Sequence, residues 1–350
     1  MSAIVAAART QALDVRTGRQ RRRRRHRLVT LGLAVTVVAL FVLSLMIGRT
    51  FYDPVQVFAV LRGQNVPGAS FAIGELRLPR ATLGALTGIC YGLGGITFQT
   101  MLRNPLAAPD IIGITSGASA AGVIGIVVLS WSHAQSSLLA IVVALAIALV
   151  IYVLSSTGGA TGARLILIGI GVSAMLDSVV AYVIVRASQW DLQTAMRWLS
   201  GSLNGASWDQ VLPVAGALII LGPLLLSSGR ALDILQHGDG MARALGVSVG
   251  RTRIGVVVAA VALIAFATAA SGPITFVAFL AGPIAARLCG MSSSLLLPSA
   301  LVGAALVLAA DLGGQWAFGT RYPVGVVTGV LGAPYLILLL IRFNRSGGSL

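Results

Sequence analysis

The sequence contains no lysine: all 25 of its basic residues are arginines. A phosphate-binding P-loop needs a lysine on the phosphates, and a pyridoxal enzyme needs one for its Schiff base. This chain is therefore excluded from both chemistries. If ATP drives the protein, a second chain must hydrolyse it.

Charged residues are also scarce. They make up 10% of the 350 residues, against about 25% in soluble domains. Hydrophobic residues account for 57%, and the mean hydropathy is +0.92. A chain with this few charged residues cannot cover a surface in water. We therefore predict an all-α, polytopic membrane protein whose solvent is lipid.

Metal and cofactor chemistry has little support. Cys90 and Cys289 lie inside apolar stretches, as small buried hydrophobic residues do. His26, His133 and His237 are too widely separated to form a metal-ligand cluster. No nucleophile–base pair or cofactor loop is visible, which makes a membrane enzyme the weakest hypothesis. We expect no catalytic, cofactor-binding or metal-binding residues.

The apolar residues form ten stretches, each close to the length that crosses a bilayer as a helix. The eighth is short, and its connection to the seventh is tight. The ten predicted spans are 28–48, 80–98, 111–129, 138–154, 165–185, 211–227, 254–270, 274–288, 295–312 and 324–341.

Arginine placement predicts the orientation. With both termini inside, 18 of the 25 arginines lie in cytoplasmic segments, as the positive-inside rule favours. Most of this bias comes from nine arginines in a basic cytoplasmic tail, residues 1–27. We take the tail as a topology signal rather than a nucleic-acid or anionic-lipid site, because a span follows at once. Residues 28–342 then form the transmembrane domain, and 343–350 a cytoplasmic C-terminal tail.

Small residues and carboxylates in the spans predict packing. Gly84, Gly88 and Gly92 repeat at four-residue spacing, which lets helix backbones approach closely in lipid. Asp177 and Asp311 are the only acidic residues inside predicted spans. Two isolated aspartates make a thin proton relay, so interhelical hydrogen bonding or a cavity wall is favoured over a proton-coupled carrier.

Two long ordered motifs resemble the FecCD family of permeases in iron-siderophore and cobalamin ABC importers. The first is Arg77-Leu78-Pro79-Arg80, then an apolar span, then residues 99–110 (QTMLRNPLAAPD) and Ser116-Gly117-Ala118. The second runs from residues 272–278 (GPITFVA) through 323–326 (PVGV) to Gly332-Ala333-Pro334. The resemblance covers about residues 50–342, and the wording of 272–288 is most similar to enterobactin-type permeases.

The resemblance implies the type II ABC importer permease fold, with ten helices per subunit and two subunits around a central pathway. It implies these partners: a second permease subunit, two ATP-binding subunits, an extracytoplasmic siderophore-binding protein and a ferric siderophore. Enterobactin-type permeases pair two different chains, which favours a heterodimer. Proton-coupled transport, or import of cobalamin or haem, remains the alternative. Nucleic acid is not an expected partner.

Three sets of site residues are predicted; the resemblance implies Arg77, Arg80, Asn104, Leu106 and the coupling helix, and the sequence itself suggests Arg321 and the polar stretch that ends the fourth span. Arg77 and Arg80 would meet acidic residues of the binding protein, and Arg321 would add a third positive contact. Asn104 and Leu106, with the polar stretch Ser155-Ser156-Thr157, would narrow the cytoplasmic exit, although Asn-Pro is also an ordinary turn. The ATPase coupling helix would comprise Gly240, Met241, Ala242, Arg243, Ala244, Leu245 and Gly246.

Two positions depart from the family pattern. The eighth span has Gly282-Pro283 where the family often has Pro-His or Pro-Gln. Arg321 stands where the family often has glutamate, two residues before the Pro-Val-Gly motif. The second departure reverses the charge of the outer-face contacts.

Overall fold

A computed structural model describes residues 2–109, 113–156, 161–290 and 294–345. The elements are α1 (Ser2–Met46), α2 (Pro54–Leu61), α3 (Ala69–Phe71), the π-helical η1 (Ala72–Arg77), α4 (Leu78–Leu102), α5 (Ile114–Val123), the π-helical η2 (Ile124–Val128), α6 (His133–Ser156), α7 (Thr161–Val185), α8 (Gln189–Leu199), α9 (Trp208–Ser227), α10 (Gly229–Leu235), α11 (Asp239–Ala244), α12 (Val249–Ser271), α13 (Val277–Cys289), α14 (Leu296–Trp316) and α15 (Val324–Arg345). Every regular element of the described chain is helical.

Seven described helices are long and apolar enough to cross a membrane by length and composition, and three shorter apolar helices complete the set. Each of the ten predicted spans coincides with one of these helices. The short eighth span is confirmed, because α13 has only 13 residues. Four elements were not predicted, namely α2, the α3–η1 segment, α8 and α10.

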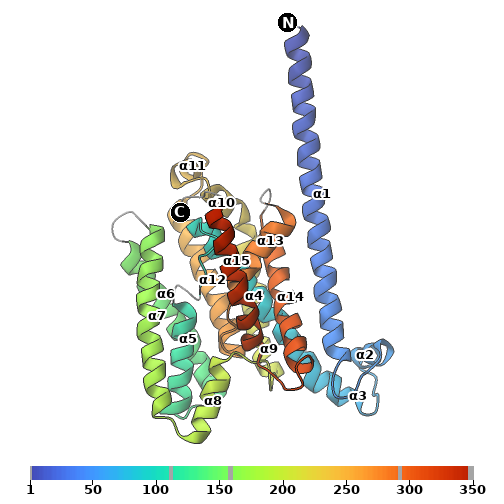
Figure 1. The fold of residues 1–350 in the computed structure, drawn as a ribbon, viewed down its shortest axis with the longest axis vertical. Helices are drawn as coiled ribbons and strands as arrows, with labels where there is room; N and C mark the ends of the chain where they lie inside the picture. Colours follow the sequence, from blue (N-terminus) through green and yellow to red (C-terminus); the bar gives the residue numbers. More distant parts are fainter. Residues whose placement is uncertain (1, 110–112, 157–160, 291–293, 346–350) are drawn as a thin grey trace.

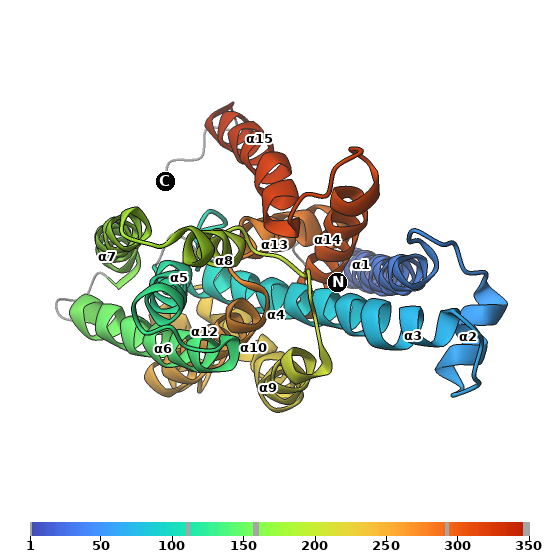
Figure 2. The ribbon, with the colours of Figure 1, turned by 90° about the horizontal axis from the view of Figure 1, so that it is seen from below.

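Helix α4 runs through the middle of the bundle, between α14 on one side and α12 on the other (Figure 2). Its predicted glycine stripe packs on α14. A Cβ added at Gly88 would meet the backbone of Gly303 and Ala304, and one at Gly92 would meet the backbone of Ser299 and Ala300. The two helices therefore touch through their backbones, as small residues permit in lipid.

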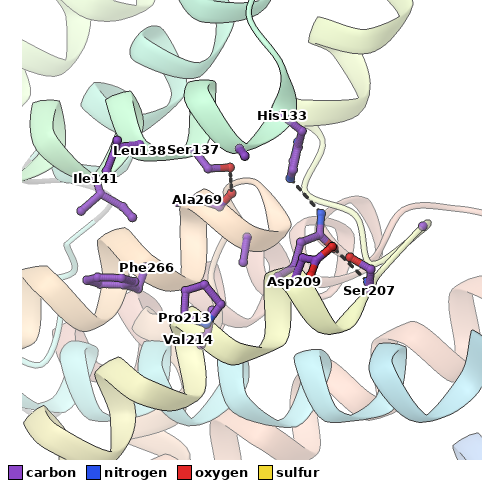
Figure 3. A pocket seen from close by; sticks show the side chains of 14 residues that line it. His133, Ser137, Leu138, Ile141, Ser207, Asp209, Pro213, Val214, Phe266 and Ala269 are labelled. Carbon is purple, nitrogen blue, oxygen red and sulfur yellow. Dashed lines mark hydrogen bonds between the residues drawn. The ribbon is translucent and has the colours of Figure 1, made fainter. Parts of the chain in front are cut away.

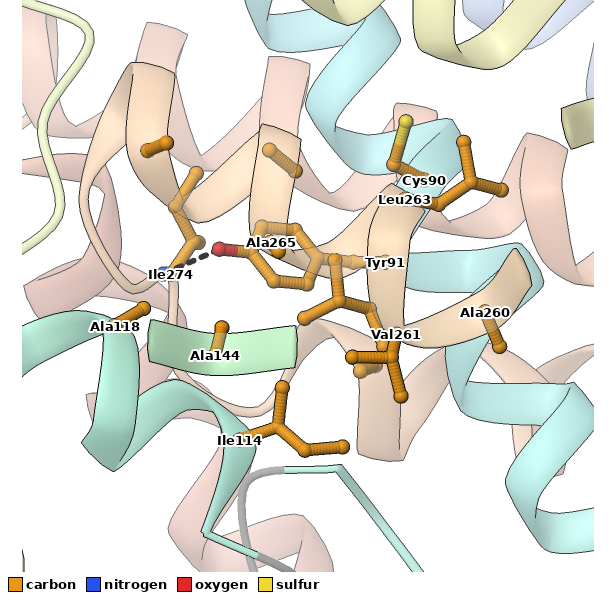
Figure 4. Packing of buried hydrophobic residues seen from close by; sticks show 14 of the residues in the cluster. Cys90, Tyr91, Ile114, Ala118, Ala144, Ala260, Val261, Leu263, Ala265 and Ile274 are labelled. Atoms are coloured by element: carbon orange, nitrogen blue, oxygen red, sulfur yellow. Dashed lines mark hydrogen bonds between the residues drawn. The ribbon is translucent and has the colours of Figure 1, made fainter. Parts of the chain in front are cut away.

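Tyr91 ties the centre of α4 to the tight connection between α12 and α13 (Figure 4). Its hydroxyl lies 2.8 Å from Thr268 Oγ1 and donates to the Gly272 carbonyl at 3.2 Å. The backbone N–H of Ile274 donates to the same hydroxyl at 3.4 Å. Because a buried hydroxyl costs free energy unless it is hydrogen-bonded, this network specifies where the turn sits.

Helix α1 is continuous through the predicted domain boundary at residue 28, and it extends well beyond the other helices (Figure 1). The boundary is therefore not a break in secondary structure, and a separate tail remains a prediction. Arg25 and His26 attach the helix to the bundle near the end of α13 and the start of α14. The Arg25 guanidinium donates to the carbonyls of Leu288 and Arg287 at 3.1 and 3.3 Å.

Candidate functional site

Four arginines line one pocket at the end of the bundle where α4 begins. Arg77, Arg80 and Arg321, which the sequence predicts for docking, line it together with Arg49. The pocket has a volume of ≈ 360 Å³ and lies between the end of α1, η1, the start of α4 and the end of α14. Sequence analysis missed Arg49, because the quoted motifs begin after it. We call this end of the bundle the arginine face.

The Arg80 guanidinium is bound within the chain. Its Nε donates to Asp311 Oδ2 at 2.9 Å, and its Nη2 donates to Asp311 Oδ1 at 2.7 Å. Its Nη1 donates to Asn204 Oδ1 at 2.6 Å, while Gln315 Nε2 donates to Asp311 Oδ2 at 2.8 Å. Asp311 is only 4% exposed, so a buried bidentate pair joins α4 to α14. The interhelical hydrogen bonding predicted for Asp311 is confirmed.

Arg77 caps the C-terminus of α1. Its Nη1 donates to the carbonyls of Leu45 and Met46, both at 2.8 Å, and its Nη2 donates to the Thr50 carbonyl at 2.6 Å. Its guanidinium carbon also lies 4.7 Å from the ring centroid of Tyr52. The last carbonyls of a helix lack partners within the helix and carry partial negative charge, so Arg77 satisfies them.

Arg49 and Arg321 present more of their charge to solvent, since both side chains are exposed. The Arg321 guanidinium carbon lies 5.5 Å from the ring centroid of Trp316, which leaves the edge of the guanidinium able to donate. The docking role of the arginines remains a prediction. Because Arg77 and Arg80 are bound within the chain, Arg321 and Arg49 are better placed to contact a docking partner.

A larger pocket of ≈ 610 Å³ opens between α6, α9 and α12 (Figure 3). Its rim holds His133, whose Nε2 lies 2.8 Å from Gln210 Nε2, and its wall includes the apolar side chains of Ile141 and Phe266. In Figure 2, α9 and α12 lie on the side away from α7 and α15. None of the described residues that line this pocket belongs to a predicted site, so we assign it no part in the predicted function.

The predicted exit residues lie at the other end of α4. Asn104 Oδ1 accepts the Leu106 N–H at 2.9 Å, and the Asn104 N–H donates to the Gln99 carbonyl at 3.1 Å. Leu106 packs in a cluster with Phe279 and Tyr335. Asn104 therefore forms the turn that the sequence offered as the alternative, and the gating role remains a prediction.

The second part of the predicted exit ends α6. Ser155 is buried, and its hydroxyl donates to the Tyr152 carbonyl of the same helix at 3.0 Å. Ser156 is the last residue of α6, and Thr157 lies outside the described residues. A role of this stretch in closing an exit also remains a prediction.

The predicted coupling segment contains the short helix α11, at the end of the bundle opposite the arginine face (Figure 1). We call this end the α11 face. Ala242 is fully buried among Leu235 and Val249. Met241 and Leu245 are 55% and 61% exposed. Gly240, Arg243, Ala244 and Gly246 are exposed as well. Thus α11 has one anchored side and one free apolar side.

Asp239, which the sequence analysis did not select, fastens the start of α11 to two other helices. Its Oδ1 accepts from Arg103 Nη2 at 2.8 Å and from Arg253 Nη2 at 3.1 Å. Arg103 follows α4, and its Nε also donates to the Leu235 carbonyl at 3.0 Å. The cluster connects α11 with the end of α4 and with α12, and no local pattern signalled it.

Helix α7 exposes a charge inside an apolar span. Asp177 is exposed, within a candidate span of residues 164–185. Met175 and Tyr182 beside it are 71% and 58% exposed. A carboxylate in contact with lipid costs several kcal/mol, roughly 3 on insertion scales. This side of α7 therefore suits a protein partner or a water-filled path.

Comparison with known proteins identifies the family. Residues 35–342 match the FecCD transport family. The chain is 39% identical over 299 residues to the ferric enterobactin transport system permease protein FepG of Escherichia coli (strain K12), which covers 85% of this chain and 91% of that protein. It is 37% identical over 311 residues to the achromobactin transport system permease protein CbrC of Dickeya dadantii (strain 3937), with 87% and 89% covered.

A vitamin B12 import system permease protein, BtuC of Vibrio cholerae, is 33% identical over 332 residues, with 94% of this chain and 97% of that protein covered. Among solved structures, a metal-chelate type ABC transporter in an inward-facing conformation superposes with a TM-score of 0.81 at 27% identity. That match covers 91% of this chain and all of the other.

The ten apolar helices among the described residues, together with the family match, define a multi-pass membrane transport permease. It belongs to the FecCD transport family.

Proposed function

We propose that this chain is the permease subunit of an ATP-driven importer that moves a ferric siderophore across the cytoplasmic membrane. Helix α11 carries the proposal, because it presents Met241 and Leu245 outward from a helix anchored by buried Ala242. Exposed apolar side chains on an anchored helix suit insertion into a groove of another protein. That protein would be one of two ATPase subunits, which supply the ATP chemistry that a lysine-free chain lacks.

The orientation follows from this assignment. The α11 face would be cytoplasmic, with both termini on that side, and the arginine face would be extracytoplasmic. Arginine forks bind carboxylates in a defined geometry, so the exposed Arg321 and Arg49 suit acidic residues on a siderophore-binding protein. Arg77 and Arg80 would contribute charge to the same surface while they stay bound to the end of α1 and to Asp311 of α14.

The exposed Asp177 side of α7 supports a second permease subunit, with the path between the two chains. The siderophore assignment draws on the relatives named for ferric enterobactin and achromobactin, at 39% and 37% identity, against 33% for the vitamin B12 permease. A heterodimer is favoured, since the enterobactin-type permeases that it resembles pair two different chains. Iron stays within its chelator, so the permease needs no metal ligands of its own.

Proteoliposomes containing this chain, its permease partner and the ATPase subunits would test the proposal. Uptake of ferric enterobactin should require ATP on the side of the membrane that carries the ATPase subunits. It should also require the binding protein on the opposite side. It should persist when a protonophore collapses the proton gradient. Uptake without the ATPase that stops with the protonophore would instead identify the alternative, a proton-coupled carrier, and ATP-driven uptake of cobalamin or haem alone would reassign the substrate.

A further inference from the structure

The N-terminal part of α1 carries a run of arginines that lies outside the family match, which begins at residue 35. Figure 1 shows this part at the same end of the molecule as α11 but well to its side. Two contacts set the rotation of the helix. Arg25 Nε donates to the Leu288 carbonyl at 3.1 Å, and His26 Nε2 lies 3.1 Å from the Ser294 carbonyl. The side of α1 opposite these contacts faces away from the bundle.

That outward side carries Gln20, Arg23, Arg24, Arg27 and Leu28, whose side chains border a shallow space on the surface of this one helix. We call these five residues the basic groove. Their spacing of three and four residues places them along one face of a helix, and all five are exposed. The three arginines form no ion pair with any residue that the structure describes. Their charges are therefore available to an anion.

The same face continues as an apolar stripe at helical spacing. Leu28, Leu31, Val35 and Val38 are 57%, 63%, 61% and 62% exposed. Residues 28–38 rise by about 15 Å along the helix axis, which is half of the ~30 Å hydrocarbon core of a bilayer. The stripe thus has the depth of one leaflet, with the arginines at its headgroup end.

The sequence favoured a topology signal over an anionic-lipid site for this tail, but from the geometry of α1 we propose that this face binds an anionic phospholipid in the leaflet at the α11 face, which is the cytoplasmic leaflet in the orientation proposed above. The phosphate lies among Arg23, Arg24 and Arg27, where guanidinium groups donate charge-assisted hydrogen bonds to its oxygens. An acyl chain follows the stripe from Leu28 to Val38. An acidic protein would meet the arginines but gain nothing from that stripe, so the combined pattern favours a lipid.

Lipid retention by the purified full chain tests the proposal. The chain is kept in a neutral detergent, and dioleoyl-phosphatidylglycerol or dioleoyl-phosphatidylcholine is added before native mass spectrometry. The wild type should retain phosphatidylglycerol preferentially. Arg24→Gln/Arg27→Gln should lower its apparent affinity for phosphatidylglycerol about thirty-fold, since each arginine near an anionic surface contributes roughly a factor of five. Phosphatidylcholine retention should not change.

The matched control is Arg21→Gln/Arg22→Gln. It removes the same charge, but these two residues lie one turn before Arg25 and His26, towards the bundle side. It should retain phosphatidylglycerol at least about threefold better than Arg24→Gln/Arg27→Gln, because it removes the same nearby charge but keeps the guanidinium groups that donate hydrogen bonds to the phosphate. Thermal unfolding of both double variants identifies any loss of folding.

Four results would overturn the proposal. Equal losses in the two double variants would reveal a general charge effect. Equal retention of the two lipids by the wild type would remove the anionic preference. Displacement by soluble glycerophosphoglycerol at the same concentration would remove the acyl-chain contact. Unchanged lipid retention with weaker ATPase assembly in Arg24→Gln/Arg27→Gln would make the groove a protein surface. None of these readouts depends on siderophore transport, so the proposed function can fail independently.

Discussion

Arg80 at the start of α4 and Asp311 in α14 form a bidentate pair, with Nη2–Oδ1 at 2.7 Å and Nε–Oδ2 at 2.9 Å. The pair joins the start of α4 to α14 in the wall of the pocket on the arginine face. The side chains of Arg80 and Asp311 are 19% and 5% exposed. The burial of this ion pair makes Arg80, which belongs to the predicted docking set, a structural residue as well.

Asp311→Asn should destabilise the protein by about 3 kcal/mol, because it leaves the Arg80 charge without its buried partner. The measurement is thermal unfolding in detergent. Asp177→Asn removes the same charge from an exposed position in α7 and should leave the melting temperature of the isolated chain unchanged. An unaltered melting temperature for Asp311→Asn would show that the pair does not hold α4 to α14.

Gly48→Ala should lower the melting temperature, because a Cβ at this position would collide with the Arg77 guanidinium and displace it from the end of α1. The cap would then be lost, at a cost of about 1–2 kcal/mol. Gly32→Ala, inside α1, is the control, since a Cβ there meets nothing within 4 Å, whereas Gly48 lies two residues past the end of that helix. Equal melting temperatures for the two variants would mean that Arg77 does not depend on Gly48.

Met241→Asp/Leu245→Asp should weaken copurification with the ATPase subunit by at least tenfold, because the exposed apolar side of α11 would become charged. Its melting temperature should match that of the wild type. Ala242→Asp should instead lower the melting temperature by burying a charge without a partner. Normal ATPase assembly by the Met241/Leu245 variant would show that this side of α11 is not the coupling surface.

Asp239→Asn should loosen α11 without unfolding the bundle. The two ion pairs are partly exposed, so their loss should cost about 1 kcal/mol or less. Hydrogen exchange of the α11 amides should therefore accelerate up to about fivefold. Asp233→Asn is the control in the preceding helix, where the described residues show no ion pair to an arginine. Identical α11 exchange in the two variants would remove the role of the Asp239 cluster.

Arg321→Glu should slow association with the siderophore-binding protein, since exposed charges at an interface govern mainly the encounter rate and its salt dependence. A fall of roughly tenfold is expected at low salt and little change at high salt. Surface plasmon resonance on the full chain in nanodiscs measures it. Arg62→Glu provides a control at an exposed arginine outside the pocket, and equal slowing by both would exclude a specific site.

The sequence by itself determined the all-helical fold, the ten spans and the family. Hydropathy, span length and ordered motifs are local properties, so each can be recognised without knowing what packs against it. The glycine stripe of α4 was also legible, because helical periodicity places Gly84, Gly88 and Gly92 on one side. The position of α11 followed from its motif, although only the structure separated its buried Ala242 from its exposed neighbours.

The tertiary structure alone decided what the arginines do. Arg80 meets Asp311 across 231 positions in the chain, and Arg103 meets Asp239 across 136. Arg77 turns back to α1 carbonyls that no side-chain pattern marks. An arginine near a membrane face can snorkel, cap a helix, pair with a carboxylate or remain exposed and bind another protein. Which of these occurs depends on the acceptors that folding brings within hydrogen-bonding distance, and those acceptors are distant in sequence.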